Sequence, residues 1–343
     1  MESRGVNGQA KRWRGGTPYT THKLVRYKAR GHLGARTLMA ERSIATRLGI
    51  SALNILGPGL GLLRVGEARR GFAFLAAPVF VLLAFTLAFA LLPTMTLAGG
   101  IAVSAAAIAM ALAILGGSVW LTWRASRERP ARLPLYARWY VLVVIIIISG
   151  LASDLAIELA HSYYKPFYLP SDSMAPTLSR SDKIIADMRA RQRPAMGAIV
   201  LVRTPDAIYV KRVAALPGDS VAMRAGVPII NGKAALQRNE GKIDVSGSDG
   251  MESGILFTEQ FPGEASPHHI VKIEQSALDD MPTTVVPAGH IFLLGDNRDR
   301  SADSRVSPEN MGLGMVSEAR VIGRPLFIHW SADRSRIGRD VSH

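Results

Sequence analysis

The stretch YLPSDSMAPTLSRSDKIIAD, residues 168–187, crowds hydroxyl side chains into one turn region. Four of these hydroxyl residues are Ser171, Ser173, Thr177 and Ser179. A serine hydroxyl is a weak nucleophile until a neighbouring group takes its proton. The stretch contains neither His nor Cys, so a nucleophile located here needs a base from another part of the chain.

Lys211 is one candidate for that base, because it lies in the strand-like run IYVKRV, residues 208–213. Side chains alternate between the two faces of a strand, so Lys211 points away from Val210. If it shares a shielded face with Tyr209 and Val213, burial lowers the pKa of its ammonium group. Lowering that pKa from about 10.4 to about 8 takes about 3 kcal/mol of desolvation. On these residues alone, an ordinary strand lysine remains the simpler interpretation.

Two other chemistries fit the sequence less well. A Ser-His-Asp triad needs a histidine in a recognisable context, and we expect the histidines from residue 161 onward to be surface or turn residues. These are His161, His268, His269, His290, His329 and His343. A calcium loop at 296–304, DNRDRSADS, fails because Arg298 and Arg300 interrupt the oxygen ligands. This segment instead predicts a turn braced by Asp–Arg pairs.

The composition favours a membrane protein with charged flanks. The 343 residues are 48% hydrophobic, and the formal net charge is +14. The chain has no cysteine, which excludes disulfides, thiol nucleophiles and iron–sulfur clusters. Three apolar segments reach the length of about 20 residues that a membrane-spanning helix needs. They are 71–93, 97–122 and 139–157.

The N-terminal part of the chain consists of a basic segment followed by an apolar region that contains these spans. Residues 1–49 are rich in Lys and Arg, and predict a mostly disordered basic tail without a cleavable signal peptide. The membrane region then covers 50–158. Its first run, ISALNILGPGLGLL at 50–63, is short and broken by Gly and Pro, and predicts an interfacial or re-entrant segment. Asp154 and Glu158 mark the outer end of the third span.

Loop charges predict how the spans are oriented. Basic residues precede the first span, and more follow the second span, in the loop 124–138. The arginines of these two segments are Arg64, Arg69, Arg70, Arg124, Arg127, Arg129, Arg132 and Arg138. The positive-inside rule places both segments in the cytoplasm. Three spans then put everything after about residue 158 on the outer side of the membrane.

Residues 162–343 predict a mainly β domain on that outer side. Short alternating runs followed by turns indicate strands at 198–204, 207–216, 226–233 and 290–297. Asn231-Gly232 is a two-residue hairpin signal. An insertion around 225–288 includes a polar, Gly-rich part, 238–285, that we expect to be elaborated or to form long loops. The expected fold is therefore N-terminal transmembrane helices followed by a mainly β catalytic domain.

Three blocks of the outer domain, taken in order, resemble the type I signal peptidases, membrane-bound Ser/Lys proteases. The blocks are PSDSMAPTL at 170–178, YVKRVAALPGD at 209–219 and GDNRDRSADSR at 295–305. By this resemblance Ser173 is the nucleophile and Lys211 its general base. Ser171 is then the hydroxyl that helps the backbone N–H of Ser173 form the oxyanion hole.

The resemblance also implies supporting and substrate-binding residues. Ser301 matches a serine that orients the lysine by hydrogen bonding, and Asp303 with Arg305 matches a supporting acid–base pair. Four residues match positions lining shallow substrate pockets for an A-x-A-like site: Leu169, Pro170, Met174 and Val210. The sequence departs from the family at Arg300, where Asn is usual, and in the segment that follows Arg305.

The function implied is removal of signal peptides from exported preproteins by an enzyme of the cytoplasmic (inner) membrane, whose catalytic domain lies on the extracytoplasmic, periplasmic side. The implied partners are signal peptides and the lipid bilayer, with no nucleic acid and no cofactor or metal. The basic segments would meet anionic lipid. Two alternatives stay open: a specialised relative that matures a narrow substrate set, and a catalytically silent membrane-anchored binding module. The substrate range and the oligomeric state are not predicted.

Overall fold

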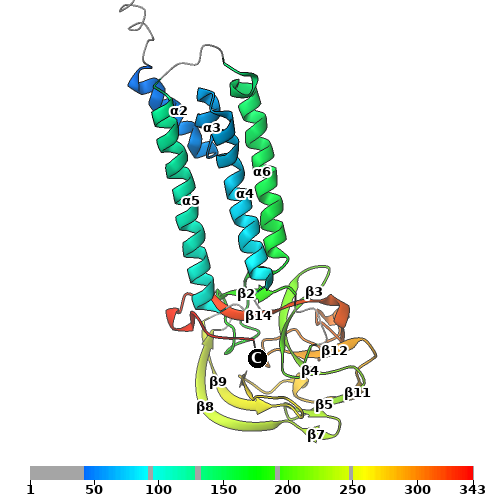
Figure 1. Cartoon of the computed structure of the whole chain (residues 1–343). Coiled ribbons are helices and arrows are strands. Elements are labelled where there is room, and N and C mark those ends of the chain that lie inside the picture. Colours follow the sequence, from blue (N-terminus) through cyan, green and yellow to red (C-terminus); the bar gives the residue numbers. More distant parts are fainter. Residues whose placement is uncertain (1–41, 92–95, 128–132, 190–193, 247–249, 343) are drawn as a thin grey trace, which may run out of the picture. The chain divides into compact units, whose positions relative to one another are not determined.

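The computed structural model describes residues 42–91, 96–127, 133–189, 194–246 and 250–342 (Figure 1). These residues fall into two compact units. One contains the described parts of Met1–Leu75 and Ile114–Ile147, and the other contains those of Ala76–Ala113 and Ile148–His343. Most of the predicted basic tail, residues 1–41, lies outside the described residues. Its last part is not disordered as expected, because helix α2 (Ile44–Leu56) begins there, capped by the Ser43 hydroxyl.

The first unit is organised around the Gly- and Pro-rich run that interrupts the apolar sequence. Helix α2 ends at Leu56, and a short helix, α3 (Leu60–Val65), follows. Asn54 is fully buried between them, and its side-chain oxygen accepts the backbone N–H of Gly59 at 2.8 Å. Its amide nitrogen donates to the Thr122 hydroxyl at 3.0 Å. One amide side chain therefore satisfies the backbone of this break and ties it to the end of another helix.

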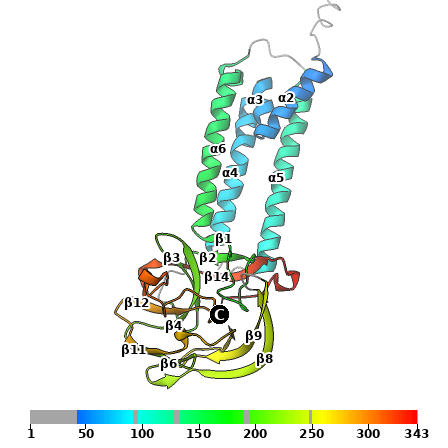
Figure 2. The ribbon, with the colours of Figure 1, turned by 180° about the vertical axis from the view of Figure 1, so that it is seen from behind.

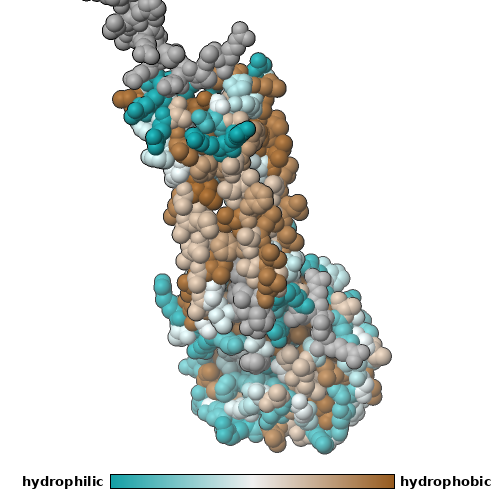
Figure 3. All heavy atoms as spheres, in the orientation of Figure 1, coloured by the Kyte–Doolittle hydropathy of each residue, from teal (hydrophilic) through white to brown (hydrophobic). Residues whose placement is uncertain are grey.

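All three predicted spans are helical. They are α4 (Ala68–Leu91), α5 (Leu97–Ala125) and α6 (Trp139–His161), each long and apolar enough to cross a membrane. Apolar residues dominate the surface of these helices (Figure 3). Helices that are apolar all round bury no single face in a protein core, which is the pattern of a membrane span.

The second unit carries a curled seven-stranded sheet, which confirms the mainly β expectation. Its strand order is β1-β2-β14-β3-β4-β12-β13. The strands are β1 (Tyr164–Tyr168), β2 (Lys183–Asp187), β3 (Ile199–Arg203), β4 (Ile208–Ala215), β12 (His290–Leu294), β13 (Val316–Ser317) and β14 (Val321–Trp330). All of the pairs in this sheet are antiparallel, and β14 lies between β2 and β3.

Two smaller sheets complete the domain (Figure 2). One contains β5 (Ser220–Arg224), β6 (Val227–Ile230), β7 (Lys233–Ala234) and β11 (Met281–Val285). The other contains β8 (Leu236–Ser246), β9 (Met251–Gln260) and β10 (His268–Lys272). The predicted hairpin at Asn231-Gly232 is confirmed, since both residues have positive φ and join β6 to β7. The expectation of long loops at 238–285 is wrong, since strands β8 to β11 lie there. These strands were missed because polar strands that are exposed on one face lack a continuous apolar signal.

The two faces of β2 and β14 are used differently, and this difference positions the candidate site. Ile184 and Ile328 pack with Met174, from the loop after β1, in one hydrophobic cluster. Ile185 and Phe327, which alternate with them along the strands, pack in a separate cluster. The loop that holds the hydroxyl residues is thus anchored to one face only.

Candidate active site

The loop from β1 to β2 carries Ser173 and is held by two buried carboxylates. Asp172 accepts the backbone N–H of Arg180 at 2.7 Å, and Asp182 accepts the backbone N–H of Ser179 at 2.9 Å. Carboxylates that satisfy backbone donors in this way fix a turn locally. The hydroxyl-rich sequence therefore folds into a defined loop.

Lys211 and Ser173 meet directly, although one lies in the middle of β4 and the other in that loop. The Lys211 Nζ is 2.7 Å from the Ser173 Oγ, a hydrogen bond between groups 38 residues apart in the chain. The lysine is only 2% exposed, whereas Ser173 is half-buried. A hydroxyl within hydrogen-bond reach of a shielded amine is an arrangement that could serve as a nucleophile with its base.

Burial changes the acid–base chemistry of Lys211. Loss of hydration lowers its pKa from 10.5 to about 8, because the charged ammonium is disfavoured away from water. The carboxylates of Asp303 and Asp296 act in the opposite direction and raise this pKa, and Arg305 lowers it further. A substantial share of the lysine is therefore neutral near pH 8 and able to accept a proton.

The turn after β12 brings the next group of predicted residues to this lysine. Asp303 is completely buried and pairs with Arg305 at 2.9 Å. It also accepts the backbone N–H of Gly295 at 3.0 Å, and the neighbouring Arg305 keeps the pKa of this carboxyl below its usual value. A fixed negative charge thus stands close enough to act on Lys211.

Ser301 is buried in the same turn, and its hydroxyl makes no hydrogen bond with any of the described residues. The hydrogen bond expected between Ser301 and Lys211 is therefore not present in this conformation. Gly295 explains the close packing here. A Cβ at this position would overlap both the Ser301 hydroxyl and the backbone carbonyl of Ser173. Only glycine lets the turn approach the loop this closely.

Ser171 and the expected substrate-lining residues lie around Ser173. The Ser171 hydroxyl is exposed and donates to the Ser173 Oγ at 3.3 Å. Three of the lining residues are buried in one hydrophobic cluster of the sheet: Leu169, Met174 and Val210. Pro170, the fourth, is exposed beside them. Ser171 therefore lies beside Ser173, while Leu169 and Met174 of the same loop pack with Val210 in the hydrophobic cluster.

A buried ion pair links the strand of the lysine to the turn, and the sequence reasoning missed it. Arg212 and Asp296 are each 1% exposed and make a two-pronged contact, with both N–O distances at 2.8 Å. The Thr177 hydroxyl donates to the same carboxylate at 2.5 Å. The Asp303–Arg305 pair is bracing of the kind that the turn sequence predicts, whereas Asp296 pairs with an arginine from outside the turn. The sequence signal for this ion pair was Arg212 itself, an arginine next to Lys211 in an otherwise apolar strand.

His268 is not the surface or turn residue that we expected. It is buried on β10, with its Nδ1 2.8 Å from Glu264 and its Nε2 3.3 Å from Glu259. Burial lowers the pKa of the imidazole, but the carboxylates of Glu259 and Glu264 outweigh this and raise it. Glu259 also pairs with the buried Arg298. His268 therefore belongs to an ionic cluster behind the turn.

Arg300, the departure from the family pattern, points to two acidic partners. Its guanidinium lies 3.0 Å from Glu252 and 2.7 Å from Glu274. These contacts are partly exposed, so they stabilise the fold little. The carboxylates of Glu252 and Glu274 do, however, neutralise the positive charge that Arg300 adds at this position.

Comparison with known proteins places the match over the third span and most of the β domain. Residues 137–330 match the family described as signal peptidase, peptidase S26. "Signal peptidase I U" of Bacillus subtilis is 32% identical over 193 residues, which cover 55% of this chain and 87% of that protein. "Probable signal peptidase I-1" of Synechocystis is 26% identical over 213 residues, which cover 59% and 89%. "Signal peptidase I" of Pseudomonas aeruginosa is 29% identical over 192 residues, which cover 49% and 65%.

Proposed function

This chain belongs to the signal peptidase family, peptidase S26, and we propose that Ser173 and Lys211 form the dyad with which it cleaves signal peptides. The protein is a serine endopeptidase. The observation that carries the proposal is the 2.7 Å contact between the Lys211 Nζ and the Ser173 Oγ, made by a buried lysine.

The first half of the reaction forms an acyl-enzyme. Neutral Lys211 takes the proton from Ser173, and the Oγ attacks the carbonyl carbon of the scissile peptide bond. The oxyanion that develops accepts hydrogen bonds from the Ser171 hydroxyl and the backbone N–H of Ser173. The Lys211 ammonium then returns its proton to the leaving amine, which frees the mature protein and leaves the signal peptide as an ester on Ser173.

The second half releases the signal peptide. Lys211, neutral again, takes a proton from a water molecule, and the resulting hydroxide attacks the ester carbonyl. Collapse of the tetrahedral intermediate restores the Ser173 hydroxyl with the proton held by the lysine. A shallow pocket lined by four residues would accept only small substrate side chains, as an A-x-A-like cleavage site requires. These residues are Leu169, Pro170, Met174 and Val210.

We further propose that the enzyme acts at the outer face of the cytoplasmic membrane. The three apolar helices provide the anchor. The arginines before and at the start of α4, and those at the end of α5 and beyond it, hold these segments in the cytoplasm by the positive-inside rule. A substrate tethered by its own signal peptide then meets an enzyme tethered to the same bilayer.

The direct test is cleavage of a purified A-x-A preprotein by the full chain in detergent, with the new N-terminus identified by sequencing. Release of a mature protein beginning one residue after the second Ala supports the proposal. Cleavage of a single native substrate and of no general preprotein indicates a specialised relative. No cleavage of any preprotein, by a chain that remains folded, contradicts the proposal.

The pH dependence of kcat/KM should report the buried lysine. Since the base is the neutral amine, we expect the rate to fall about tenfold per pH unit below a pKa of about 8 and to level off above it. Asp303→Asn removes a carboxylate that raises this pKa, so its residual activity should rise at lower pH than that of the wild type. An inflection unmoved by Asp303→Asn, or one near pH 10, contradicts a lysine base in this environment.

Ser171→Ala should lower kcat by about 10²–10³-fold, the usual cost of removing one oxyanion donor, with a smaller change in KM. Ser179→Ala is the matched control, because it removes the same hydroxyl from the same loop at a position outside the proposed oxyanion hole. Steady-state kinetics on one preprotein compares the two variants. Equal rates for both variants would remove Ser171 from the mechanism.

A further inference from the structure

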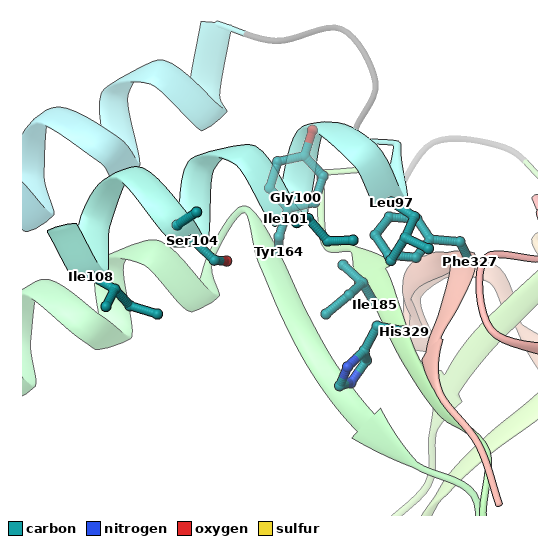
Figure 4. Close-up of a pocket in the computed structure, with 10 residues that line it drawn as sticks. Leu97, Gly100, Ile101, Ser104, Ile108, Tyr164, Ile185, Phe327 and His329 are labelled. Carbon is teal, nitrogen blue, oxygen red and sulfur yellow. The ribbon is translucent and has the colours of Figure 1, made fainter. Parts of the chain in front are cut away.

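A cavity of about 530 Å³ lies between α5 and the sheet, within the second unit (Figure 4). One wall is the first turns of α5, with Leu97, Ile101 and Ile108. The other wall is the sheet, with Ile185 from β2 and Phe327 from β14. The volume falls in the range of ligand sites, which are about 300–1,000 Å³, and the lining is mainly apolar.

The cavity is separate from the proposed substrate site. Side chains alternate along a strand, and Ile184 and Ile328 pack on the face that holds Met174. Ile185 and Phe327 lie on the opposite face and line the cavity. A peptide bound at Ser173 is thus on the other side of the sheet.

One wall indicates what kind of molecule reaches the cavity. The most apolar 18-residue window of helix α5 has a mean hydropathy of 2.2, and none of this window is buried inside the protein. A helix of this kind is surrounded by lipid, and the cavity lies against the first three turns of its outer end. The molecules available at that depth are the acyl chains of membrane lipids.

A row of three paired residues runs across the same face of the sheet, beside the cavity. Tyr168, Lys183 and Trp330 are opposite one another on β1, β2 and β14. Both aromatic rings are exposed, and the Lys183 Nζ lies 4.7 Å from the Trp330 ring centroid. None of the described carboxylates forms an ion pair with Lys183. Tyr, Trp and Lys at one level are typical of the membrane–water interface, where lysine attracts anionic headgroups.

His329 adds a polar group to the cavity wall itself. Its Nε2 is buried and has no hydrogen-bond partner among the residues that the structure describes. Burial and the nearby Lys183 lower the pKa of this imidazole, so the ring is neutral at pH 7. A neutral imidazole offers one donor and one acceptor, which suits an ester or glycerol oxygen.

We propose that this cavity binds one anionic phospholipid. An acyl chain lies between Ile101 and Phe327, the ester region meets His329, and the phosphate lies at Lys183 between the two aromatic side chains. The site would hold the sheet at a fixed depth in the outer leaflet, independently of the reaction at Ser173.

The test uses the full chain, equilibrated in vesicles of equal parts phosphatidylglycerol and phosphatidylcholine. The protein is extracted in mild detergent, and its retained lipid is measured by native mass spectrometry. We expect the wild type to retain one phosphatidylglycerol. Ala105→Phe fills the cavity and should abolish retention. Ala106→Phe adds the same ring on the adjacent, non-lining position of α5 and should retain the lipid.

Lys183→Gln should keep a bound lipid but lose about fivefold of the preference for phosphatidylglycerol, the effect of one cation near anionic headgroups. Lys233→Gln, on an exposed hairpin, should change nothing. Preprotein cleavage by Ala105→Phe in lipid-free detergent checks that this variant is folded. Unchanged retention by folded Ala105→Phe overturns the proposal. So does displacement of the lipid by a signal peptide, which would make the cavity a substrate site.

Discussion

Lys211→Met should lower kcat for preprotein cleavage by at least about 10⁴-fold, because it removes the base while keeping an apolar stem of similar length. Ser173→Ala should reduce the rate to a similar level, since a nucleophile and its base act as one unit and their losses do not add. Rates of mature protein release, measured over hours at high enzyme concentration, give the residual activity.

Lys211→Arg makes the same test sharper. Arginine keeps the positive charge and the length of the side chain but does not lose its proton at any workable pH. If Lys211 acted only by holding a positive charge near Ser173, this variant would remain active. We expect it to be as inactive as Lys211→Met. Lys233→Met, an exposed lysine changed in the same way, should cleave at the wild-type rate.

Asp296→Ala should destabilise the β domain by about 3–5 kcal/mol, because it leaves the Arg212 guanidinium buried without its counter-ion. The free energy of unfolding is obtained from denaturant titration of the chain in detergent, followed by tryptophan fluorescence. Glu274→Ala, which removes one exposed partner of Arg300, should have little effect and serves as the control for breaking an ion pair.

The double variant Arg212→Met with Asp296→Leu separates two explanations of that loss. If the cost arises from an unpaired buried charge, removing both charges should recover most of the stability. If the pair instead holds the turn in place by itself, the double variant should be as unstable as Asp296→Ala. Recovery of stability together with lost cleavage would assign the pair a role in positioning Lys211.

The sequence patterns were enough to predict the helices and the mainly β domain, whereas the residues expected around Ser173 came from the resemblance to a known family. Local sequence patterns predict the helices and strands, because apolar length indicates a membrane span and alternation indicates a strand. The burial of Lys211 depends on tertiary packing, and Asp303 from the turn after β12 lies close enough to act on its charge. The position of Asp303 is set by that long-range packing, which no local pattern encodes.

His268 shows the limit of local reasoning most clearly. It lies in a segment that the sequence suggested was an irregular insertion, so it was expected at the surface, yet it is buried against Glu259 and Glu264. The cluster exists because β9 and β10 pair and cover the turn that carries Arg298. The long-loop expectation for 238–285 failed for a similar reason, since β8, β9 and β10 pair with one another and β11 pairs with β5.

The position of β14 in the sheet has a consequence for when the enzyme becomes active. Ser173 belongs to the part of the chain around β1 and β2, and Lys211 belongs to the hairpin of β3 and β4. These two parts do not pair with each other, because β14 lies between them. The proposed dyad is therefore completed only when a strand made more than a hundred residues later has been inserted. A nascent chain that already includes Ser173 and Lys211 but not yet β14 would therefore lack the proposed dyad and would be inactive.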